Sequence, residues 1–344
     1  MKTGILTFHD VSNYGALLQA YGLQQTLKKL GSESEFVAIR RKVQEVNPAS
    51  SPFAKRMLKA KEKRDLLFDE FRNKYLTVSK CYEQGEQIND DYDVFITGSD
   101  QVWNTAIADV DARYFLPFAS PEKRYSYAAS FGEAAVAENN REWIAKQLSV
   151  FQGLSVREEK GKQIIQDLIG KDALVCIDPV FLLDEEEWLS LTEEHTGDPY
   201  LLLFLLQYDE EFVKMAKEEA TAKGIEIKIV TAGYMPQLGF EAWSSTSVNQ
   251  WLSLIRNAVC VYSDSFHALA FSLIFKTDYC RKPLGGQLQG RNGRTEELLS
   301  LLKIDPEKMQ GIILPFSEEQ DRSALKQRKD ISLDYLKGII SRNQ

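Results

Sequence analysis

Histidine and cysteine are scarce in this sequence. Its 344 residues include only three histidines and four cysteines, and Cys81, Cys176, Cys260 and Cys280 form no C-x-x-C pair. So small and scattered a set does not provide the His/Cys spacing of a zinc site, and we expect no metal centre. Cys176 and Cys260 stand in apolar, strand-like runs, where a buried reduced thiol is the simplest interpretation.

An excess of positive charge and long apolar segments are also missing. The formal net charge of -8 argues against a general nucleic-acid binder, although a local arginine cluster can still hold an anionic small molecule. No apolar run reaches the ~18 residues that span a bilayer, and no signal peptide opens the chain. We therefore expect a cytoplasmic protein with no nucleic-acid partner and at most peripheral membrane contact.

Several well-known motifs of catalysis and nucleotide binding are absent. The sequence contains no G-x-x-x-x-G-K-[ST], G-x-G-x-x-G, H-E-x-x-H or G-x-S-x-G. P-loop enzymes, simple dinucleotide-binding proteins, zincins and α/β-hydrolases are accordingly disfavoured.

Alternating strands and helices indicate the fold class. The spacing of apolar residues predicts strands over 3–8 and 35–39 with a helix over 16–30 between them, which is typical of a Rossmann-like layer. A second alternation begins at residue 200. We expect an α/β protein with two Rossmann-like domains facing across a cleft. The boundaries are 1–178 for the N-terminal domain, 179–322 for the C-terminal domain, and 323–344 for a C-terminal helix that could pack back on the first domain.

A basic helix is predicted over residues 54–76. Its first half, A-K-R-M-L-K-A-K-E-K-R, could touch anionic lipid head groups or a phosphate-bearing acceptor. A solvated charged face is the simpler interpretation of the same pattern.

The stretch from Ala258 to Lys276 is where we expect the chemistry. Residues 258–262 predict a buried strand and 266–275 a buried helix, with the N-cap residue types Ser263, Asp264 and Ser265 between them. This arrangement puts His267 at the carboxyl end of a strand, where open α/β sheets bind ligands. A satisfied core histidine is an equally good interpretation. His9 could line the same cleft, whereas His195 lies in a polar loop.

Polar residues also follow other predicted strands. Asn13 and Gly15 precede the first helix, although a glycine in such a turn is more often structural. Residues 98–104, G-S-D-Q-V-W-N, end a strand over 93–97. Arg157 ends another strand and could grip a carboxylate or phosphate, or else form a surface salt bridge with a neighbouring glutamate.

Five ordered motifs resemble those of the polysaccharide pyruvyl transferases. They are Asn13-Tyr14-Gly15, residues 98–104, Ser155-Val156-Arg157-Glu158, Asp178-Pro179-Val180-Phe181-Leu182-Leu183 and Asp264-Ser265-Phe266-His267. The resemblance runs from about residue 5 to residue 300. It implies a fold similar to the GT-B glycosyltransferases, and transfer of the enolpyruvyl group of phosphoenolpyruvate to a sugar diol, giving a pyruvate ketal and phosphate.

The resemblance also implies roles for single residues. The catalytic histidine of the family falls on His267, and its phosphoenolpyruvate-binding arginine falls on Arg157. Two departures remove a family feature: Ser265 stands where many members have an arginine, and Ala16 where many have an aspartate. One anion contact is thus missing, and an arginine of the following loop could replace it. The loop arginines are Arg281, Arg291 and Arg294.

The resulting expectations for the site are as follows. His267 acts as general acid, because imidazole exchanges protons near neutral pH, and Asp100 is the candidate base. The donor site comprises Arg157, Ser265, Phe266 and Arg294. The acceptor site comprises Asn13, Gly15, Ser99 and Trp103, with the indole as a stacking platform. Phosphoenolpyruvate is a co-substrate, and no cofactor or metal is expected.

Two other functions remain compatible with the sequence. One is a sugar-nucleotide glycosyltransferase with the same architecture, because a fold does not determine a function. The other is a non-catalytic glycan-binding protein that has lost the donor site, as Ser265 and Ala16 would suggest. The acceptor could be a free sugar or a lipid-linked oligosaccharide, and the sequence does not distinguish them.

Overall fold

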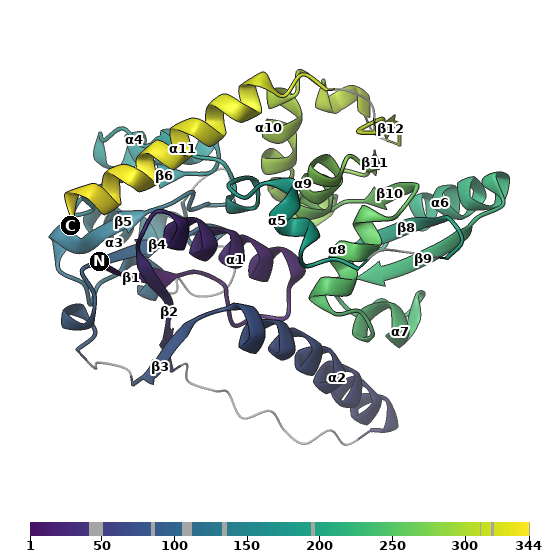
Figure 1. Ribbon diagram of the computed structural model, residues 1–344, viewed down its shortest axis with the longest axis horizontal. Helices are drawn as coiled ribbons and strands as arrows, with labels where there is room; N and C mark the ends of the chain where they lie inside the picture. The colour runs from purple at the N-terminus through teal and green to yellow at the C-terminus, as the bar shows by residue number, and fades with distance from the viewer. Residues whose placement is uncertain are drawn as a thin grey trace.

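Two parallel β-sheets, each covered by helices, lie side by side along the long axis of the molecule (Figure 1). The computed structural model describes residues 1–40, 51–83, 87–104, 112–132, 136–193, 197–309, 311–317 and 320–343. The loop histidine His195 lies outside these residues.

The first sheet has the strand order β3-β2-β1-β4-β5, and all its strand pairs are parallel. Its strands are β1 (Lys2–Leu6), β2 (Glu33–Ile39), β3 (Val78–Tyr82), β4 (Val94–Thr97) and β5 (Arg124–Ser126). A short parallel pair, β6 (Ser155–Val156) and β7 (Leu174–Val175), continues it beyond β5 through isolated bridges. The helices of this half are α1 (Tyr14–Lys29), α2 (Pro52–Tyr75), α3 (Glu138–Leu148) and α4 (Glu159–Ile169).

The second sheet has the order β12-β11-β10-β8-β9 and is parallel except for β12 at its edge. Its strands are β8 (Tyr200–Leu205), β9 (Glu226–Thr231), β10 (Cys260–Ser263), β11 (Asp278–Arg281) and β12 (Ile313–Leu314). Its helices are α5 (Glu185–Leu189), α6 (Glu210–Lys223), α7 (Gly239–Ser244), α8 (Val248–Arg256), α9 (Phe266–Phe275) and α10 (Gly293–Leu301).

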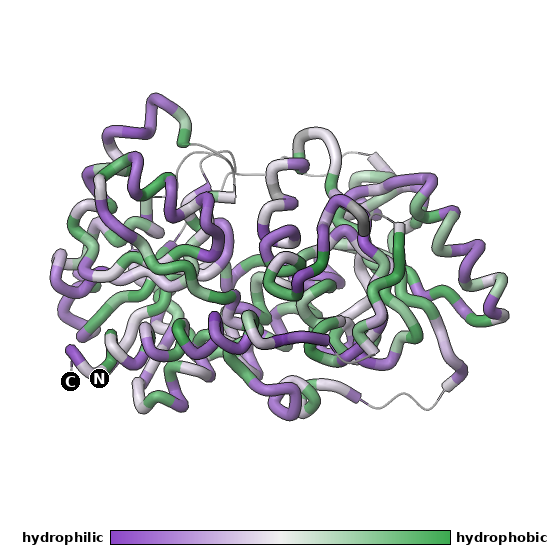
Figure 2. The backbone as a smooth tube through the Cα atoms, turned by 90° about the horizontal axis from the view of Figure 1, so that it is seen from above, coloured by the Kyte–Doolittle hydropathy of each residue, from purple (hydrophilic) through white to green (hydrophobic). Residues whose placement is uncertain are grey.

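The central strands are apolar because helices cover both faces of each sheet. All six residues of β8, Y-L-L-L-F-L, are buried, and so are all four of β10. Buried parallel strands have near-continuous apolar sequences rather than alternating ones. Along the helices, hydrophobic and hydrophilic stretches alternate, as expected for elements with one face on a core (Figure 2).

The last helix, α11 (Ser323–Arg342), connects the two halves. It starts beside α10 and runs back over the first sheet, so that the C-terminus ends near the N-terminus (Figure 1). Its Ser332 Oγ accepts a hydrogen bond from the amide of Ile177 at 2.9 Å, and the Tyr335 hydroxyl donates to the Ser126 carbonyl at 2.9 Å. One hydrophobic core includes residues of both sheets, such as Ile5 and Leu202. The two halves are therefore packed together through apolar contacts.

None of the helices in the described ranges is both long and apolar enough to cross a membrane. Most predicted elements occur within two residues of their expected ends, and α9 has the expected bounds. Three strands, β3, β11 and β12, were not expected from the sequence. Residues 125–130, Y-S-Y-A-A-S, also predict a strand, but the observed strand is shorter, because β5 ends at Ser126.

Candidate active site

His267 lies in the first turn of α9, directly after β10. The side chain of Ser265 caps this helix by accepting from the amide of Ala268 at 3.4 Å. The Tyr279 hydroxyl donates to the carbonyls of Ser263 and Ser265, at 2.9 and 3.2 Å, which fixes the connection between strand and helix. All ten residues of α9 are buried, so the helix start is held rigidly. The first-turn amides of such a helix have no intrahelical acceptor and favour an anion.

Gly15 lies against the His267 ring. A Cβ atom at Gly15 would overlap the ring, and the three atoms nearest to it are all imidazole atoms. Gly15 belongs to the start of α1, whose N-cap Asn13 accepts from the amide of Ala16 at 3.1 Å. The glycine thus lets helices from the two halves bring their amino ends together. This close approach is a sufficient reason for a glycine at position 15, and no contact with a ligand is needed to explain it.

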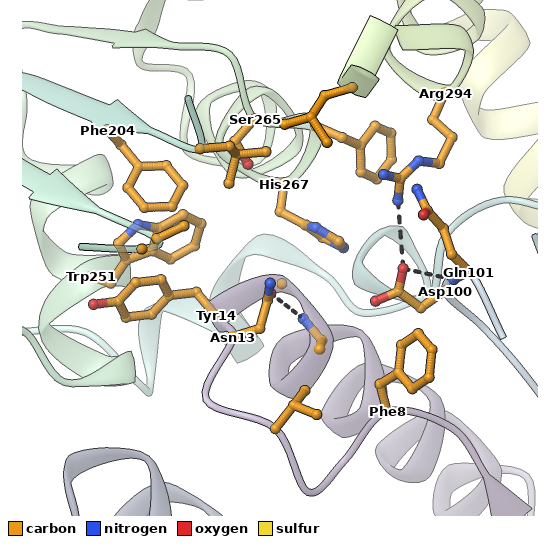
Figure 3. Close-up of a pocket in the computed structure, with 18 of the residues that line it drawn as sticks. Phe8, Asn13, Tyr14, Asp100, Gln101, Phe204, Trp251, Ser265, His267 and Arg294 are labelled. Atoms are coloured by element: carbon orange, nitrogen blue, oxygen red, sulfur yellow. Dashed lines mark hydrogen bonds and ion pairs between the residues drawn. The ribbon is translucent and has the colours of Figure 1, made fainter. Parts of the chain in front are cut away.

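A cavity of about 370 Å³ lies between the two halves at this point (Figure 3). Both halves contribute to its wall. The residues from the first half are Phe8, Val11, Asn13, Tyr14, Gly15, Ala16, Arg64, Asp100 and Gln101. Those from the second half are Phe204, Leu206, Ala232, Gly233, Trp251, Ser265, Phe266, His267, Leu284, Leu288 and Arg294.

One end of the cavity is charged. Arg294 Nη1 lies 3.5 Å from Asp100 Oδ1, which also accepts from the amide of Gln101 at 2.8 Å (Figure 3). Asp100 is the only carboxylate on the wall among the described residues. Burial lowers the pKa of Arg294 to about 10, with the neighbouring Arg157 acting in the same direction, so Arg294 remains a cation at neutral pH.

A network of ion pairs continues behind this wall. Arg157 pairs through Nη1 with Asp178 and through Nη2 with Asp100, the latter at 3.3 Å. His267 Nε2 lies 3.6 Å from Asp178 Oδ2. Burial is the largest influence and would raise the pKa of both aspartates, but Arg157, the other nearby cations and backbone hydrogen bonds together outweigh it, and the net shift of each pKa is downward. Both aspartates are therefore ionised and compensate the buried guanidinium.

The aromatic ring of Phe266 contacts both arginines. The guanidinium carbons of Arg157 and Arg294 lie 5.4 and 5.5 Å from its centroid. Such cation–π contacts fix the direction of both guanidinium groups. Phe266 therefore positions the cations, in addition to lining the cavity.

The other end of the cavity is aromatic. The rings of Tyr14 and Trp251 stack at 5.1 Å with an interplanar angle of 7°, and Phe204 packs edge-on against both (Figure 3). These rings come from both halves, so the aromatic end also depends on the packing of the two sheets.

Three nitrogen atoms of cavity-lining residues are buried without a hydrogen bond. They are His267 Nε2, Arg294 Nε and Trp251 Nε1, and none has a hydrogen-bond partner in the described part of the chain. A buried polar atom left unpaired is costly. These three unpaired nitrogens are therefore an energetic cost that the folded protein carries in the wall of the cavity.

The structure brings most of the expected site residues together. Seven of them line the cavity: Asn13, Gly15, Asp100, Ser265, Phe266, His267 and Arg294. Arg157 does not line it and lies behind Asp100. Of the loop arginines, Arg281 is turned away to the carbonyl of Pro306 at 2.7 Å, and the side chain of Arg291 lies outside the described residues.

Two expected acceptor residues lie elsewhere. Trp103 is 1% exposed, donates its indole N–H to the carbonyl of Tyr114 at 3.1 Å, and packs among Phe115 and Phe131. It is a core residue and offers no face to a sugar, so the expectation of a stacking platform is wrong. Ser99 is completely buried and its carbonyl accepts from the Thr7 hydroxyl.

Sequence reasoning missed three residues of the site. Tyr14 and Trp251 form the aromatic end, and Asp178 links Arg157 to His267. Asp178 was visible as part of a motif, but nothing in its neighbourhood indicates which cation it meets. No group of three or more potential metal ligands occurs among the residues that the structure describes.

Solved structures of similar shape define the class of fold. A candidate UDP-N-acetylglucosamine 2-epimerase from Listeria monocytogenes aligns with a TM-score of 0.51 at 10% identity, over 98% of this chain and 90% of that one. The UDP-GlcNAc 2-epimerase of Neisseria meningitidis gives 0.49 at 10% identity, over 100% and 99%. A glycosyltransferase from Streptomyces nogalater gives 0.43 at 11%, over 100% and 99%. The likeness to the Listeria protein, at 10% identity, shows the fold alone, which is two Rossmann-like domains of the GT-B type.

The sequence itself identifies the family. A model of the polysaccharide pyruvyl transferases matches residues 13–277, which is more than half of the chain. The protein belongs to the polysaccharide pyruvyl transferase family. Among curated proteins, none matches significantly. His267, Asp178 and Asp100 fall within the matched region, whereas Arg294 lies beyond it.

Proposed function

We propose that the protein transfers the enolpyruvyl group of phosphoenolpyruvate to two hydroxyl groups of one sugar, forming a pyruvate ketal and releasing phosphate. The acceptor is a polysaccharide or its precursor. The observation that carries this proposal is that His267 and Arg294 line one cavity in a member of this family. A proton donor and a fixed cation are the groups that an enol phosphate requires.

The donor would bind at the charged end of the cavity. Arg294 would hold the phosphate or carboxylate, together with the free amides at the start of α9. This arginine supplies the cation that is missing at Ser265. Arg157 would act from behind the wall, because Asp100 and Asp178 already pair with its two Nη groups.

The reaction needs one proton at carbon and two new carbon–oxygen bonds. His267 would protonate C3 of the enol phosphate, and a sugar hydroxyl would attack C2 of the resulting oxocarbenium-like centre and lose its proton. A second hydroxyl of the same sugar would then attack C2 and give its proton to the departing phosphate, the C2–O bond to phosphate would break, and the ketal would close. Arg294 would stabilise the departing phosphate.

Asp100 is the candidate base for the attacking hydroxyl. Its pairing with Arg157 and Arg294 keeps its pKa low, so it is a weak base while both pairs persist. When the donor anion takes over Arg294, Asp100 loses one of its two cations and becomes more basic. Donor binding would thereby prepare the base for the acceptor.

Phosphate release from phosphoenolpyruvate tests the proposal. Wild-type protein mixed with the donor and candidate glycans should release phosphate and give a ketal methyl signal in the NMR spectrum, and His267→Gln should abolish both. Equal rates for the two proteins would remove His267 from the mechanism. Stabilisation by uridine diphosphate but not by phosphoenolpyruvate in a thermal-shift assay would instead favour a glycosyltransferase. Glycan binding without phosphate release would favour a non-catalytic protein.

A further inference from the structure

The outward face of α2 combines basic and apolar side chains. Between residues 52 and 64 this face carries five exposed lysines and arginines against a single glutamate, in a chain of net charge -8, and a sixth basic residue, Arg64, is buried. Among the exposed large hydrophobic residues that the structure describes, Leu66 and Phe53 are the most exposed, with exposed fractions of 64% and 56%, and Leu58 and Ile312 follow at 50% each. Leu66, Phe53 and Leu58 belong to α2. A helix that exposes apolar residues beside a cluster of one charge is not explained by solvation alone.

The helical period places these side chains in two neighbouring rows. Leu58 and Leu66 are eight residues apart and share one row, and Lys55, Lys59 and Lys63 follow the adjacent row at intervals of four. The buried face, formed by Ala60, Arg64, Phe68 and Phe71, lies on the opposite side of the helix. The two rows therefore point away from the protein, except that the side chain of Lys63 reaches back to α7, where its Nζ lies 3.6 Å from Glu241 Oε2. α2 forms the lower edge of the molecule in Figure 1.

An aromatic cluster continues this face onto the second half of the protein. Phe53 packs against Tyr234 and Phe240, with ring centroids 5.9 and 6.1 Å away, and Arg56 lies 4.4 Å above the Phe240 ring. Tyr234 and Phe240 are only partly buried. Lys63 of α2 reaches Ser245, just after α7, at 2.8 Å. Aromatic and basic side chains together are typical of surfaces that lie at the interface of a bilayer.

This surface adjoins the active-site cavity. Tyr234 directly follows Ala232 and Gly233 of the cavity wall, and Arg64 of α2 is itself a wall residue. Arg64 donates to the carbonyl of Trp243 in α7 at 2.5 Å, which ties the helix to the cavity rim. A binding partner on this face of α2 and α7 would therefore lie next to the cavity.

We propose that the α2–α7 surface, formed by α2 residues 53–66 and the cluster of Tyr234 and Phe240, docks on an anionic lipid membrane. The basic row would meet the lipid phosphates, while Phe53, Leu58 and Leu66 enter the head-group region. The docking does not depend on the reaction. The additional step, that the acceptor is a lipid-linked oligosaccharide delivered from the same membrane, rests on the proposed function.

Vesicle flotation tests the docking with the full-length protein. The probes are vesicles of phosphatidylcholine alone and vesicles in which about a third of the lipid is phosphatidylglycerol. We expect binding to the anionic vesicles only. Raising the salt from about 0.1 M to about 1 M shortens the Debye length from ~10 Å to ~3 Å and should release the protein.

Matched variants locate the surface. Lys55→Glu with Lys59→Glu should weaken binding by at least about tenfold, because two attractive charges become repulsive. Leu58→Gln with Leu66→Gln should also weaken binding to the anionic vesicles, but the dependence of this binding on salt concentration should stay unchanged. Lys214→Glu with Lys217→Glu, on exposed positions of α6, makes the same charge change elsewhere and should have no comparable effect.

Three results would overturn the proposal. They are no binding to anionic vesicles, equal binding to both kinds of vesicle, and equal weakening by the α2 and α6 lysine pairs. Circular dichroism and the melting temperature show whether each variant is folded. Phosphate release with a water-soluble acceptor should be unchanged in the α2 variants. If the protein binds anionic vesicles but releases no phosphate, the proposal that it docks on membranes is supported and only the proposed reaction is refuted.

Discussion

Substituting Gly15 by alanine should disturb His267 directly. The three heavy atoms nearest to an added Cβ are Nδ1, Cγ and Cε1 of the imidazole, and all of them are closer than contact distance. The ring cannot simply move away, because Phe266 packs on it with centroids 5.0 Å apart and Asp178 lies near its other nitrogen. Either the ring rotates out of its position or the amino ends of α1 and α9 separate.

The expected cost follows from two opposing effects. Overpacking in a well-packed core costs ~1–3 kcal/mol. Alanine is also a better helix former than glycine by up to ~1 kcal/mol, which partly offsets that cost. We therefore expect a net loss of about 1–2 kcal/mol in the free energy of unfolding. A reacting group displaced by about 1 Å loses about a hundredfold in rate, so the effect on activity should be much larger than the effect on stability.

Chemical denaturation and phosphate release from phosphoenolpyruvate measure the two effects separately. Gly338→Ala is the matched control, because Gly338 lies within α11 and an added Cβ there meets no atom within 4 Å. The control should be stabilised by about 0.5–1 kcal/mol and keep full activity. If Gly15→Ala behaved like the control in both assays, the close packing of glycine on imidazole would be refuted as the reason for this residue.

Three further predictions concern the charged network and the core. Asp178→Asn should destabilise the protein at neutral pH by about 3 kcal/mol, because it leaves Arg157 partly uncompensated. The folded-state pKa of Asp178 is lowered, so its contribution is present above the unfolded-state pKa of about 3.9 and is lost at lower pH. In denaturation curves the gap between the two proteins should shrink below about pH 4, and a gap independent of pH would contradict this. Arg294→Gln should raise the KM for phosphoenolpyruvate by at least about tenfold, and an unchanged KM would exclude Arg294 from the donor site. Trp103→Phe should lower stability by about 1–3 kcal/mol and leave the KM for the acceptor unchanged, whereas a raised acceptor KM would restore a binding role for the indole.

Local signals in the sequence were sufficient to place the helices that bear the site. Ser265 marks the start of α9, and Asp209 with Gly224 marks both ends of α6. The strand β3 was not expected, because most of its residues, V-S-K-C-Y, are exposed and form no apolar pattern. An edge strand of this kind is specified by its neighbour in the sheet and not by its own residues.

The pairing of charges could not be predicted, because it depends on distances that the sequence does not contain. Arg157 and Asp178 are 21 residues apart and meet only because β6 and β7 are adjacent in space. Trp103 was misassigned for a related reason. A tryptophan after a strand can face the cleft or the core, and only the packing of Phe115 and Phe131 decides between them.

The position of α11 restricts how the two lobes can separate. Its first half holds the second lobe through Arg328 and Glu297, 3.2 Å apart, and its second half holds β5 through Tyr335. A helix of 20 residues resists stretching and bending, so a hinge that opened on its side would break one of these contacts. Opening on the opposite side would break the contacts between α2 and α7, such as those of Arg64 with Trp243 and of Lys63 with Ser245. The two lobes are therefore clamped on both sides of the cavity, and a ligand has to enter without a wide separation of the lobes.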